Sequence, residues 1–315
     1  MRIIVTGAGG FVGRALVRRL TAEHIIVALD RACDSLANIP GATLIEGDLT
    51  DEKVIAAAVG EGCDAVIHLA TVPGGAAEQD PAAGWRVNID GTAALVEAVC
   101  RARKAPRFFF ASSIAVFGDP LPPAVDDDSP LRPRMLYGAH KAMMEQWLAT
   151  MTRRGALDAA SLRLPGILAR PRAPSGMKSA FMSDLFHAAR VREMFVAPVS
   201  PEAMMWLMSR ERIVQNLAHA LTLGRGAVGE PFALTLPAVR CSFGALVGEV
   251  ARQAGIGADF VRYAPDVALE AGFGRQPPLT TRHADRLGFT HDGTVEELVA
   301  AAFRGIEAEE SEKHA

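Results

Sequence analysis

Several features that would place a protein in a membrane or on a nucleic acid are missing from this 315-residue sequence. No apolar run reaches the length needed to span a bilayer. Basic and acidic residues nearly balance, at 33 and 36, and no Lys/Arg-rich run stands out, so nucleic acid and anionic membranes are not expected partners. The apolar start, Arg2–Val5, is too short for the core of a signal peptide, and we therefore expect a cytoplasmic protein.

Cysteine is also scarce, and its pattern excludes two further classes of protein. The four cysteines form no C-x-x-C pair and have no histidine-rich neighbourhood. Neither a disulfide framework nor a metal site is therefore expected. We predict reduced and mostly buried thiols at Cys33, Cys63, Cys100 and Cys241.

Nearly continuous apolar runs alternate with helical patterns in the first half of the chain. Such runs are typical of strands that are buried on both faces, as in a parallel sheet. Strand, crossover helix and strand, repeated several times, predict an α/β fold with a doubly wound parallel sheet of the Rossmann type. The expected strands are Arg2–Val5, Ile25–Leu29, Thr43–Glu46, Ala65–Leu69 and Arg107–Ala111, and the expected helices are Phe11–Leu20, Trp85–Arg103 and Tyr137–Arg153.

The character of the sequence changes after Leu168. Residues 169–205 are rich in Pro, Arg and Met, and the helical and strand patterns that follow predict a smaller α/β lobe that binds substrate. Ser209 is the expected N-cap of a helix that runs to Leu223. The expected organisation is a dinucleotide-binding domain at 1–168 with parts of 205–225 packing back on it, a substrate-binding lobe at 169–308, and a flexible tail at 309–315.

A glycine-rich stretch, T-G-A-G-G-F-V-G at residues 6–13, follows the first expected strand. Gly7 allows a tight turn, Gly10 lets a pyrophosphate approach the backbone, and Gly13 lets the helix pack closely on the strand. The helix N-terminus, with Phe11 and Val12, offers free N–H groups and the positive end of the helix dipole to the phosphates. The stretch therefore predicts a dinucleotide-binding turn.

An aspartate at the end of the second expected strand bears on the choice of cofactor. Asp30 stands 17 residues after Gly13 (30 − 13), where a carboxylate can accept hydrogen bonds from both hydroxyls of the adenosine ribose. The same carboxylate would repel a phosphate on that ribose, which favours NAD over NADP. Arg31 follows at once and partly offsets this preference, so NADP is not excluded.

Further candidates follow the third and fourth expected strands, at the sheet edge where such folds bind ligands. Asp48 either bonds the adenine amino group or is a turn residue before the next helix. His68 is predicted to be a buried, hydrogen-bonded histidine and not a catalyst. The cofactor contacts expected at this edge are Asp48, Leu49, Leu69, Ala70 and Thr71.

Tyrosine and lysine are scarce, yet Tyr137 and Lys141 stand four residues apart in the stretch Y-G-A-H-K and so share one helical face. An isolated phenol is a poor base at neutral pH, but a nearby ammonium favours the phenolate. Lowering the pKa of a phenol by about 3 units requires roughly 4 kcal/mol. Ser113, at the end of an expected strand, would hydrogen-bond a substrate oxygen whose proton Tyr137 takes or gives, while a nicotinamide carries the hydride.

Taken together, these motifs resemble the extended short-chain dehydrogenase/reductases of the NAD-dependent epimerase/dehydratase family. The resemblance implies a catalytic set of Ser113, Tyr137 and Lys141, cofactor contacts from Asn88 and Pro165, and a homodimer formed through two long helices. It covers nearly the whole chain through TGAGGFVG, Asp30, GDL at 47–49, HLAT at 68–71, VNIDGT at 87–92, SSIAVFG at 112–118, YGAHK at 137–141 and LRLPGI at 162–167.

Two departures separate the chain from the sugar-nucleotide enzymes of that family. Phe117 stands where many of them have tyrosine, and residues 204–221 lack their R-x-F-I-H-V-x-D pattern. The chain is instead similar to the D-erythronate dehydrogenase branch, in its M-W-L-M-S run and its R-P-x-x-P loop at Arg170–Pro174. That branch commonly has Ser-Pro-Arg where this chain has Ser209-Arg210-Glu211. The resemblance implies oxidation of an alcohol next to a carboxylate in a small sugar acid.

A small acid substrate requires a cation, and arginines after residue 169 are candidates, although a solvated surface position explains each of them equally well. Trp206 either floors the pocket or packs in the core. The substrate candidates are Ser112, Ser113, Arg170, Arg172, Ser179, Trp206, Arg210 and Arg212.

Three functions are compatible with the sequence. The favoured one is an NAD-dependent dehydrogenase of a small polyhydroxy acid. The second is a nucleotide-sugar epimerase or dehydratase, which returns the hydride to its own intermediate and keeps NAD bound. The third is a non-enzymatic NAD-binding protein, because a fold does not determine a function, but the Ser–Tyr–Lys set argues against it.

Overall fold

The computed structural model describes residues 1–118, 120–172 and 178–313, and the chain divides into two compact units. The segments of the two units alternate along the chain. Unit 1 comprises Met1–Val116, Pro133–Arg163 and Val214–Thr235, and unit 2 comprises Phe117–Arg132, Leu164–Ile213 and Leu236–Ala315.

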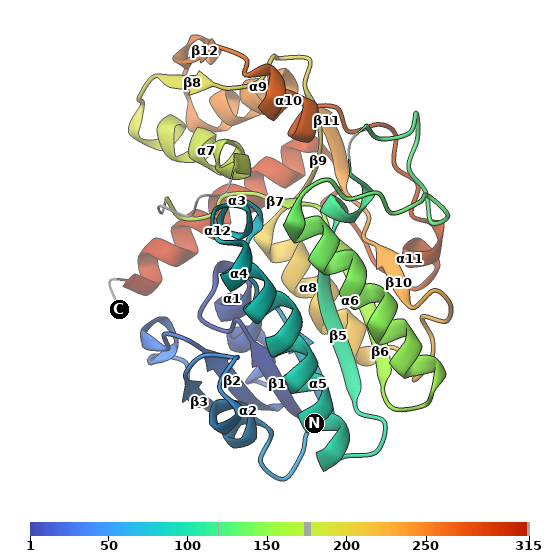
Figure 1. The fold of residues 1–315 in the computed structure, drawn as a ribbon. Coiled ribbons are helices and arrows are strands. Elements are labelled where there is room, and N and C mark those ends of the chain that lie inside the picture. The colour runs from blue at the N-terminus through green and yellow to red at the C-terminus, as the bar shows by residue number, and fades with distance from the viewer. Residues whose placement is uncertain (119, 173–177, 314–315) are drawn as a thin grey trace. The chain divides into compact units, whose positions relative to one another are not determined.

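Unit 1 is built on a parallel sheet, as the alternating apolar runs predicted. Among the described residues this sheet has seven strands in the order β10-β6-β5-β4-β1-β2-β3. β1 pairs in parallel with both β2 and β4, so the chain winds outward from β1 in two directions, which confirms the doubly wound Rossmann fold (Figure 1). The strands are β1 (Arg2–Thr6), β2 (Ile25–Asp30), β3 (Ala42–Glu46), β4 (Ala65–His68), β5 (Arg107–Ser113), β6 (Asp158–Leu164) and β10 (Ala233–Thr235).

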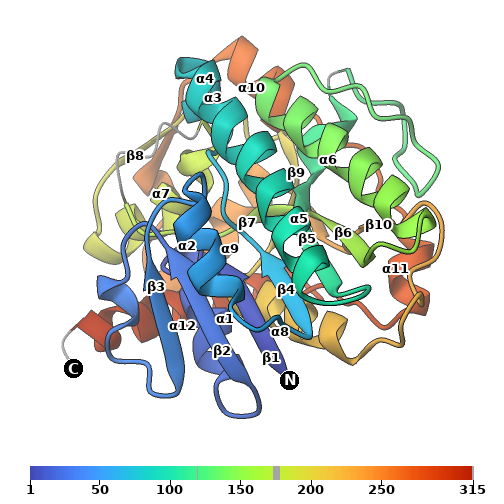
Figure 2. The same ribbon diagram turned by 60° about the horizontal axis from the view of Figure 1, so that its bottom comes forward.

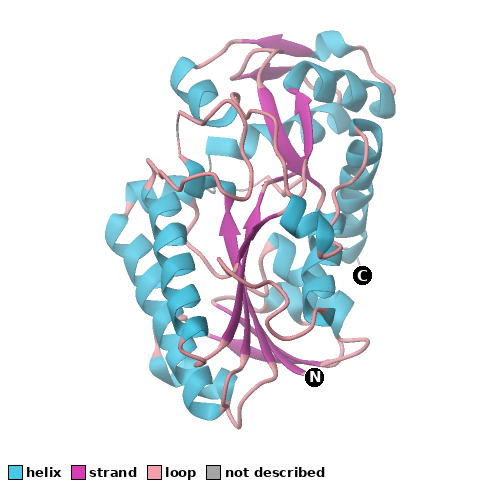
Figure 3. Ribbon diagram, turned by 90° about the vertical axis from the view of Figure 1, so that its right-hand side faces the viewer, coloured by secondary structure: helices cyan, strands magenta, loops and turns pink. Residues whose placement is uncertain are grey.

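Helices cover both faces of this sheet (Figures 2 and 3). The face under α2, α5 and α6 forms one apolar core that includes Val66, Phe108 and Leu148. Each large apolar side chain buried in this way contributes roughly 1.5–3 kcal/mol to folding. On the opposite face lie α1 and the part of α8 that belongs to unit 1. The helices are α1 (Phe11–Leu20), α2 (Glu52–Val59), α3 (Gly74–Gln79), α4 (Pro81–Trp85), α5 (Thr92–Ala102), α6 (Leu136–Arg153) and α8 (Arg210–Thr222).

Unit 2 has its own core and its own small sheets, as expected for a second α/β lobe. A three-stranded sheet has the order β11-β9-β7, and β8 pairs with β12. Their apolar residues pack with those of α7, α9 and α12 in one buried cluster. The elements are β7 (Gly166–Ile167), β8 (Phe195–Ala197), β9 (Met204–Met208), β11 (Val239–Ser242), β12 (Val261–Tyr263), α7 (Phe181–Val191), α9 (Phe243–Ala254), α10 (Val267–Phe273), α11 (Arg282–Arg286) and α12 (Val295–Lys313).

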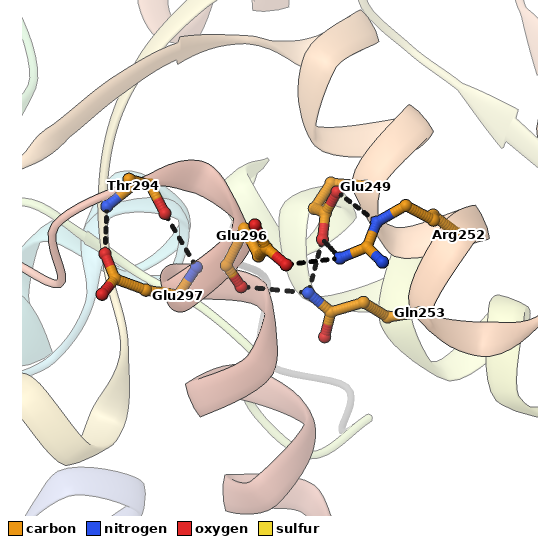
Figure 4. A network of polar contacts seen from close by, with 6 residues as sticks. All are labelled: Glu249, Arg252, Gln253, Thr294, Glu296 and Glu297. Atoms are coloured by element: carbon orange, nitrogen blue, oxygen red, sulfur yellow. Dashed lines mark hydrogen bonds and ion pairs between the residues drawn. The ribbon is translucent and has the colours of Figure 1, made fainter.

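A polar network links α9 to the start of α12 on the surface of unit 2 (Figure 4). Arg252 donates to Glu249 at 2.6 Å and to Glu296 at 2.9 Å. Thr294 and Glu297 exchange backbone-to-side-chain hydrogen bonds of 2.8 and 3.2 Å, which is the reciprocal arrangement of a capping box. Because the Arg252 side chain is 58% exposed, solvent screens its ion pairs, and they contribute little to stability. The apolar packing of the two helices therefore holds them together.

An ion pair anchors the last part of α12. The helix continues to Lys313, and Glu309 is only 4% exposed. The Oε1 atom of Glu309 lies 3.1 Å from Nη1 of Arg210, and Nη2 of Arg210 donates to the Gly305 carbonyl at 2.7 Å. The charged tail shows no sign of this, because the partner of Glu309 stands 99 residues earlier (309 − 210). Residues 314 and 315 lie outside the described part of the chain.

Most of the thiols are buried, as the sequence predicted. Cys33, Cys63 and Cys241 are buried, Cys100 is partly buried, and all four are free. Burial raises the pKa of both Cys63 and Cys241 to about 11. Within the described ranges, no helix is long and apolar enough to cross a bilayer, and no group of His, Cys, Asp and Glu has the arrangement of a metal site.

Candidate active site

The glycine turn between β1 and α1 is packed too tightly for side chains. Gly7 has φ +66°, and a Cβ there would come within 2.6 Å of the amide nitrogen of Ala70, just after β4. A Cβ at Gly13 would meet the carbonyl oxygen of Gly7 and would lie 2.9 Å from the Cα of Ala8. Gly10 is the N-cap of α1 and has no side chain to cap it, and the first turn of α1 holds no acidic residue. The positive end of this helix is therefore presented to an anion, which fits a dinucleotide pyrophosphate.

Asp30 is held next to this turn by backbone amides. Its Oδ2 accepts from the Gly9 amide at 2.9 Å, and its Oδ1 accepts from the Arg31 amide at 2.7 Å. An ionised carboxylate has about four acceptor sites, so these bonds orient Asp30 and leave capacity for ribose hydroxyls. The position at the end of β2 is the one that the sequence predicted.

Asp48 at the end of β3 makes the bonds of a turn residue. Its Oδ1 accepts from the amide and from the hydroxyl of Thr50, both at 2.8 Å, and these bonds hold the pKa of the Asp48 carboxyl below its ordinary value. The contact with adenine stays a prediction. Leu49 is 3% exposed and packs in the apolar core, so both side chains expected to contact adenine have structural partners.

Asn88 holds the loop that follows β4. Its Oδ1 accepts from the Thr71 hydroxyl at 3.0 Å and from the Val72 amide at 2.7 Å, and its Nδ2 donates to the Val72 carbonyl at 3.0 Å. Asn88 stands in a π-helical turn, Arg86–Gly91, between α4 and α5, where the sequence predicted one continuous helix. Such turns are frequent at functional sites. The widened turn directs the asparagine side chain to the loop at the carboxyl end of β4.

His68 is the buried, hydrogen-bonded histidine that the sequence predicted. The side chain is fully buried at the end of β4. Nδ1 lies 2.6 Å from the Thr6 hydroxyl and Nε2 lies 2.9 Å from the Thr92 hydroxyl. Burial lowers the pKa of His68 to about 3, so the ring is neutral at physiological pH. Its role is to join β1, β4 and α5.

Because the pKa of His68 is low, the free energy of unfolding of the protein is expected to decrease as the solution becomes more acidic. The ordinary pKa is 6.5, so unfolding takes up a proton between about pH 6.5 and 3. The contribution of the neutral His68 ring to the free energy of unfolding is complete above pH 6.5. It is lost as the pH falls, and the total loss amounts to about 5 kcal/mol. His68→Gln is therefore expected to flatten the rise in the free energy of unfolding between pH 4 and 6.5, measured by urea denaturation, whereas the exposed His291→Gln keeps the wild-type slope. A wild-type slope in His68→Gln would contradict the neutral ring.

A glycine in α6 brings the tyrosine to the end of β5. Gly138 lies in the first turn of α6, and a Cβ there would stand 3.0 Å from the carbonyl carbon of Ala115 and would meet its oxygen more closely still. Ala115 belongs to the short 3-10 turn Ile114–Phe117 directly after β5. The absence of a side chain at Gly138 therefore lets the start of α6, with the half-buried Tyr137, pack against the strand end that carries Ser113.

Lys141 is buried one helical turn after Tyr137. The side chain is 2% exposed, and Nζ donates to the Ala111 carbonyl at 2.7 Å. Nζ also lies 4.5 Å from the centre of the Phe110 ring and 5.5 Å from the centre of the Tyr137 ring. Burial lowers the pKa of Lys141 to about 7, and the Glu145 carboxylate opposes this shift. The predicted Tyr–Lys pair is thus assembled in a largely water-free place.

The two serines at the end of β5 point to opposite faces of the sheet, as neighbours on a strand do. Ser113 is partly exposed, and its Oγ accepts from the Ala115 amide at 3.2 Å. Ser112 is 2% exposed and donates to Oε1 of Glu145 at 2.5 Å. The structure therefore corrects the place of Ser112 among the substrate candidates, since its hydroxyl is buried on a structural partner.

The structure also corrects two candidates in unit 2. Trp206 is 1% exposed, its Nε1 donates to the Pro277 carbonyl at 2.8 Å, and its ring meets Phe117 edge-to-face at 6.5 Å. It is therefore a core residue. Arg210 is 7% exposed and pairs with Glu309, so its charge stabilises the end of α12. Local sequence patterns do not show such partners, because both lie far along the chain.

The other candidates of unit 2 remain near its surface. Nη1 of Arg212 donates to Thr290 at 3.0 Å, and Nε of Arg170 donates to the Ile167 carbonyl at 3.4 Å. Arg170 follows Ala169, which is buried with φ +60°, a strained backbone for a residue other than glycine. Ser179 lies in the 3-10 turn Lys178–Ala180, Arg172 is 3.9 Å from Glu193, and Pro165 is buried between β6 and β7. Residues 173–177, with Pro174, lie outside the described part of the chain.

Comparison with known proteins decides the family. The model of the NAD dependent epimerase/dehydratase family matches residues 3–205. The chain is 32% identical to D-erythronate dehydrogenase from Cupriavidus necator over 96% of this chain and 97% of that one. The chain belongs to the NAD-dependent epimerase/dehydratase family. It is also 34% identical to D-erythronate dehydrogenase from Haemophilus influenzae, over 71% of this chain and 73% of that protein.

Solved structures agree with this family and with the fold. A nucleoside-diphosphate-sugar epimerase from Agrobacterium tumefaciens is 30% identical, with a TM-score of 0.86 over 96% of this chain and 94% of that one. An L-threonine dehydrogenase from Cupriavidus necator has a TM-score of 0.87 over 97% of this chain and 100% of that one. At 21% identity this second likeness shows the fold alone.

Family membership makes the chain an NAD-dependent enzyme of the extended short-chain dehydrogenase/reductase type. The residues present fit that cofactor. A Cβ would fill the cradle at Gly7 and Gly13, the first turn of α1 presents its positive end, and Asp30 is oriented beside the turn. NAD is accordingly the cofactor.

Proposed function

We propose that the protein is an NAD-dependent dehydrogenase that oxidises a secondary alcohol of a small sugar acid, D-erythronate or a close analogue. The observation that carries this proposal is the 32% identity to a D-erythronate dehydrogenase along nearly the full length of both chains. The buried Lys141 beside Tyr137 supports the redox chemistry, because a base is needed wherever an alcohol loses hydride.

The proposed mechanism assigns a task to each side chain. NAD, when bound, would supply the acceptor for the hydride of the carbinol carbon. Ser113 would hydrogen-bond the reacting hydroxyl and orient it, and the Tyr137 oxygen would take its proton. Lys141 would stabilise the phenolate electrostatically and would help to hold the nicotinamide ribose. The dry surroundings of Lys141 strengthen its attraction to a phenolate, because the effective dielectric constant there is well below that of water.

The cofactor residues act by binding and orientation. Gly7, Gly10 and Gly13 let the backbone approach the pyrophosphate, and Phe11 and Val12 contribute amides of the first turn of α1. Asp30 would accept hydrogen bonds from the adenosine ribose hydroxyls, and Arg31 would border that site. The remaining proposed contacts lie along the carboxyl edge of the sheet and beyond it, at Asp48, Leu49, Leu69, Ala70, Thr71, Asn88 and Pro165.

A second candidate function is nucleotide-sugar epimerisation or dehydration. The observation that favours it is the 30% identity to a protein named as a nucleoside-diphosphate-sugar epimerase. Phe117, which stands where many sugar-nucleotide enzymes have tyrosine, argues against it, since Phe117 is 2% exposed and packs on Trp206 in the core.

A substrate panel tests the proposed function. Tetronates, uronates and nucleotide sugars are each supplied with NAD and, separately, with NADP, and NADH or NADPH absorbance is followed. The proposal predicts turnover of a tetronate with NAD and much weaker turnover with NADP, since Asp30 repels the additional phosphate. Conversion of a nucleotide sugar, with no reduction of NAD by any sugar acid, would establish the second candidate instead.

A substitution at Gly138 tests whether catalysis depends on the close packing of α6 against the end of β5. In Gly138→Ala the new methyl group meets the Ala115 carbonyl, so α6 and Tyr137 must shift. We expect a loss of about 1–3 kcal/mol in stability and of about 100-fold in kcat, the scale set by a misplacement near 1 Å. Gly248→Ala in α9 is the control, because nothing lies within 4 Å of a Cβ there. Equal behaviour of the two variants would contradict the packing argument.

We also propose that the protein is a cytoplasmic homodimer engaged in sugar-acid metabolism. Three large apolar side chains on α4 and α6 are unusually exposed, namely Trp85 at 45%, Met143 at 44% and Leu136 at 37%. Such residues favour a protein interface. Light scattering after size exclusion tests this, and Met143→Glu is expected to lower the measured mass from dimer to monomer. A monomeric wild-type protein would refute the dimer.

A further inference from the structure

A network of buried charges and hydroxyl groups lies beside Lys141 in unit 1. Glu145 is 3% exposed and Arg163, on β6, is 5% exposed. Nη2 of Arg163 donates to Glu145 at 2.7 Å, and Nε donates at 3.0 and 3.2 Å to its two oxygens. Ser112 donates to the same carboxylate, and Nη1 of Arg163 lies 3.5 Å from the Thr235 hydroxyl on β10. The carboxylate is thereby fixed from two strands and its own helix.

The network continues the row formed by the Tyr–Lys pair. Tyr137, Lys141 and Glu145 stand at successive four-residue intervals of α6, so all three share one helical face. This pattern, Y-x-x-x-K-x-x-x-E, is visible in the sequence, but composition makes such a glutamate look like an exposed helix residue. Only its burial shows that a negative charge is fixed one turn beyond the lysine.

A buried ammonium requires such a charge. Lys141 has Ala111 as a carbonyl partner and the rings of Phe110 and Tyr137 nearby, and none of these three groups is a carboxylate. Isolated charges in a water-free interior lose their proton or gain a counter-charge. Glu145 is the group that opposes the effect of burial on the pKa of Lys141.

We propose that Glu145, held by Arg163 and Ser112, is a positioning residue whose fixed carboxylate keeps Lys141 as an ammonium beside Tyr137. The role of Glu145 in catalysis rests on the proposed function, in which the ammonium of Lys141 favours the phenolate form of Tyr137. Arg163 and Ser112 hold the carboxylate in one orientation.

The other titratable groups around Lys141 do not provide this charge. His68 on β4 and His140 on α6 have pKa values lowered first by burial and then by Lys141 itself. Glu78 on α3 accepts from the Leu136 amide at 2.6 Å and acts on His140. Arg163 is a cation and, by itself, would disfavour a second positive charge.

The direct test is the titration of Lys141, which needs neither cofactor nor substrate. The chain has only five lysines, so lysine labelled with ¹³C at Cε gives few NMR signals, and Lys141→Arg identifies the signal of Lys141. The wild-type midpoint is expected near pH 7. In Glu145→Gln it is expected to fall by about one unit or more, the effect of a unit charge a helical turn away at an effective dielectric constant near 20.

Two further variants make the test specific. Glu97→Gln makes the same chemical change on the surface of α5, where Glu97 is 60% exposed, and is expected to leave the midpoint unchanged. Glu145→Gln combined with Arg163→Met removes both charges. Its midpoint is expected to lie below the wild-type value but above that of Glu145→Gln, because the opposing cation is gone as well.

Each outcome decides the proposal. If Glu145→Gln folds and its midpoint stays at the wild-type value, the proposal is overturned. If Glu145→Gln does not fold, the double variant carries the same test, and a wild-type midpoint there overturns the proposal too. A purely structural role for Glu145 would change stability without moving the titration.

Kinetics then connect the charge to catalysis. Glu145→Gln is expected to lower kcat at pH 7 tenfold or more with little change in KM for NAD, and to recover part of the loss at alkaline pH, where the phenol ionises without help. Wild-type protein that oxidises no sugar acid would refute the proposed function and leave the titration result standing. Active wild-type protein with an unshifted Glu145→Gln titration would refute only the role of Glu145.

Discussion

Replacing Tyr137 with phenylalanine is expected to lower kcat by about 10²–10⁴-fold, the contribution typical of a general base, while NAD binding changes little. The substitution removes one oxygen and keeps the ring that packs near Lys141. Without that oxygen, no side chain in the proposed mechanism takes the proton of the substrate hydroxyl. NADH absorbance gives the rate, and a fluorescence titration gives the affinity for NAD.

The second tyrosine of the chain provides a matched control. Tyr263 lies in β12 of unit 2, and its ring meets Phe243 edge-to-face at 6.4 Å. Tyr263→Phe makes the same chemical change and is expected to keep near-wild-type kcat. Near-normal turnover in Tyr137→Phe, with a folded protein, would remove the proposed mechanism.

Replacing Arg163 with methionine is expected to destabilise the protein by about 3–5 kcal/mol, because it leaves the Glu145 carboxylate buried without its main partner. The volume of the side chain is nearly kept, so the loss reports the unpaired charge and not a cavity. Urea denaturation measures the free energy of unfolding.

Two controls separate the unpaired charge from other effects of the substitution. Combining Arg163→Met with Glu145→Gln removes both charges and is expected to restore most of the stability, since replacing a buried ion pair by uncharged groups is often nearly neutral. Arg153→Met breaks an ion pair with Glu230 at the surface, where Arg153 is 46% exposed, and is expected to cost far less stability than Arg163→Met. Equal losses in the buried and the exposed variant would contradict the account of this pair.

The parts of the site that could be predicted from the sequence are those set by local geometry. A glycine turn between a strand and a helix has few conformations, and the sequence placed Gly7, Gly13 and Asp30 as the structure does. The pair Tyr137 and Lys141 follows from helical spacing alone. The parallel sheet follows from apolar runs, because strands buried on both faces have no polar side.

The parts that could not be predicted depend on partners distant in sequence. A sequence pattern cannot distinguish Ser112 from Ser113. The structure does, because Ser112 donates to the buried Glu145 and is therefore the structural serine of the two. From the sequence, Arg210 is a plausible anion-binding residue, and only the structure shows that its charge is paired with Glu309. The π-helical turn at Arg86–Gly91 has no signal in its apolar spacing, which fits a continuous helix.

The most direct test of the account is whether NADH leaves the enzyme. Wild-type protein is mixed with excess NAD and D-erythronate, and NADH in solution is measured against the enzyme concentration. The account predicts NADH far in excess of enzyme, with Tyr137→Phe producing almost none in the same time. NADH that never exceeds the enzyme concentration with any sugar acid, together with NAD that remains bound through purification and supports conversion of a nucleotide sugar, would contradict it.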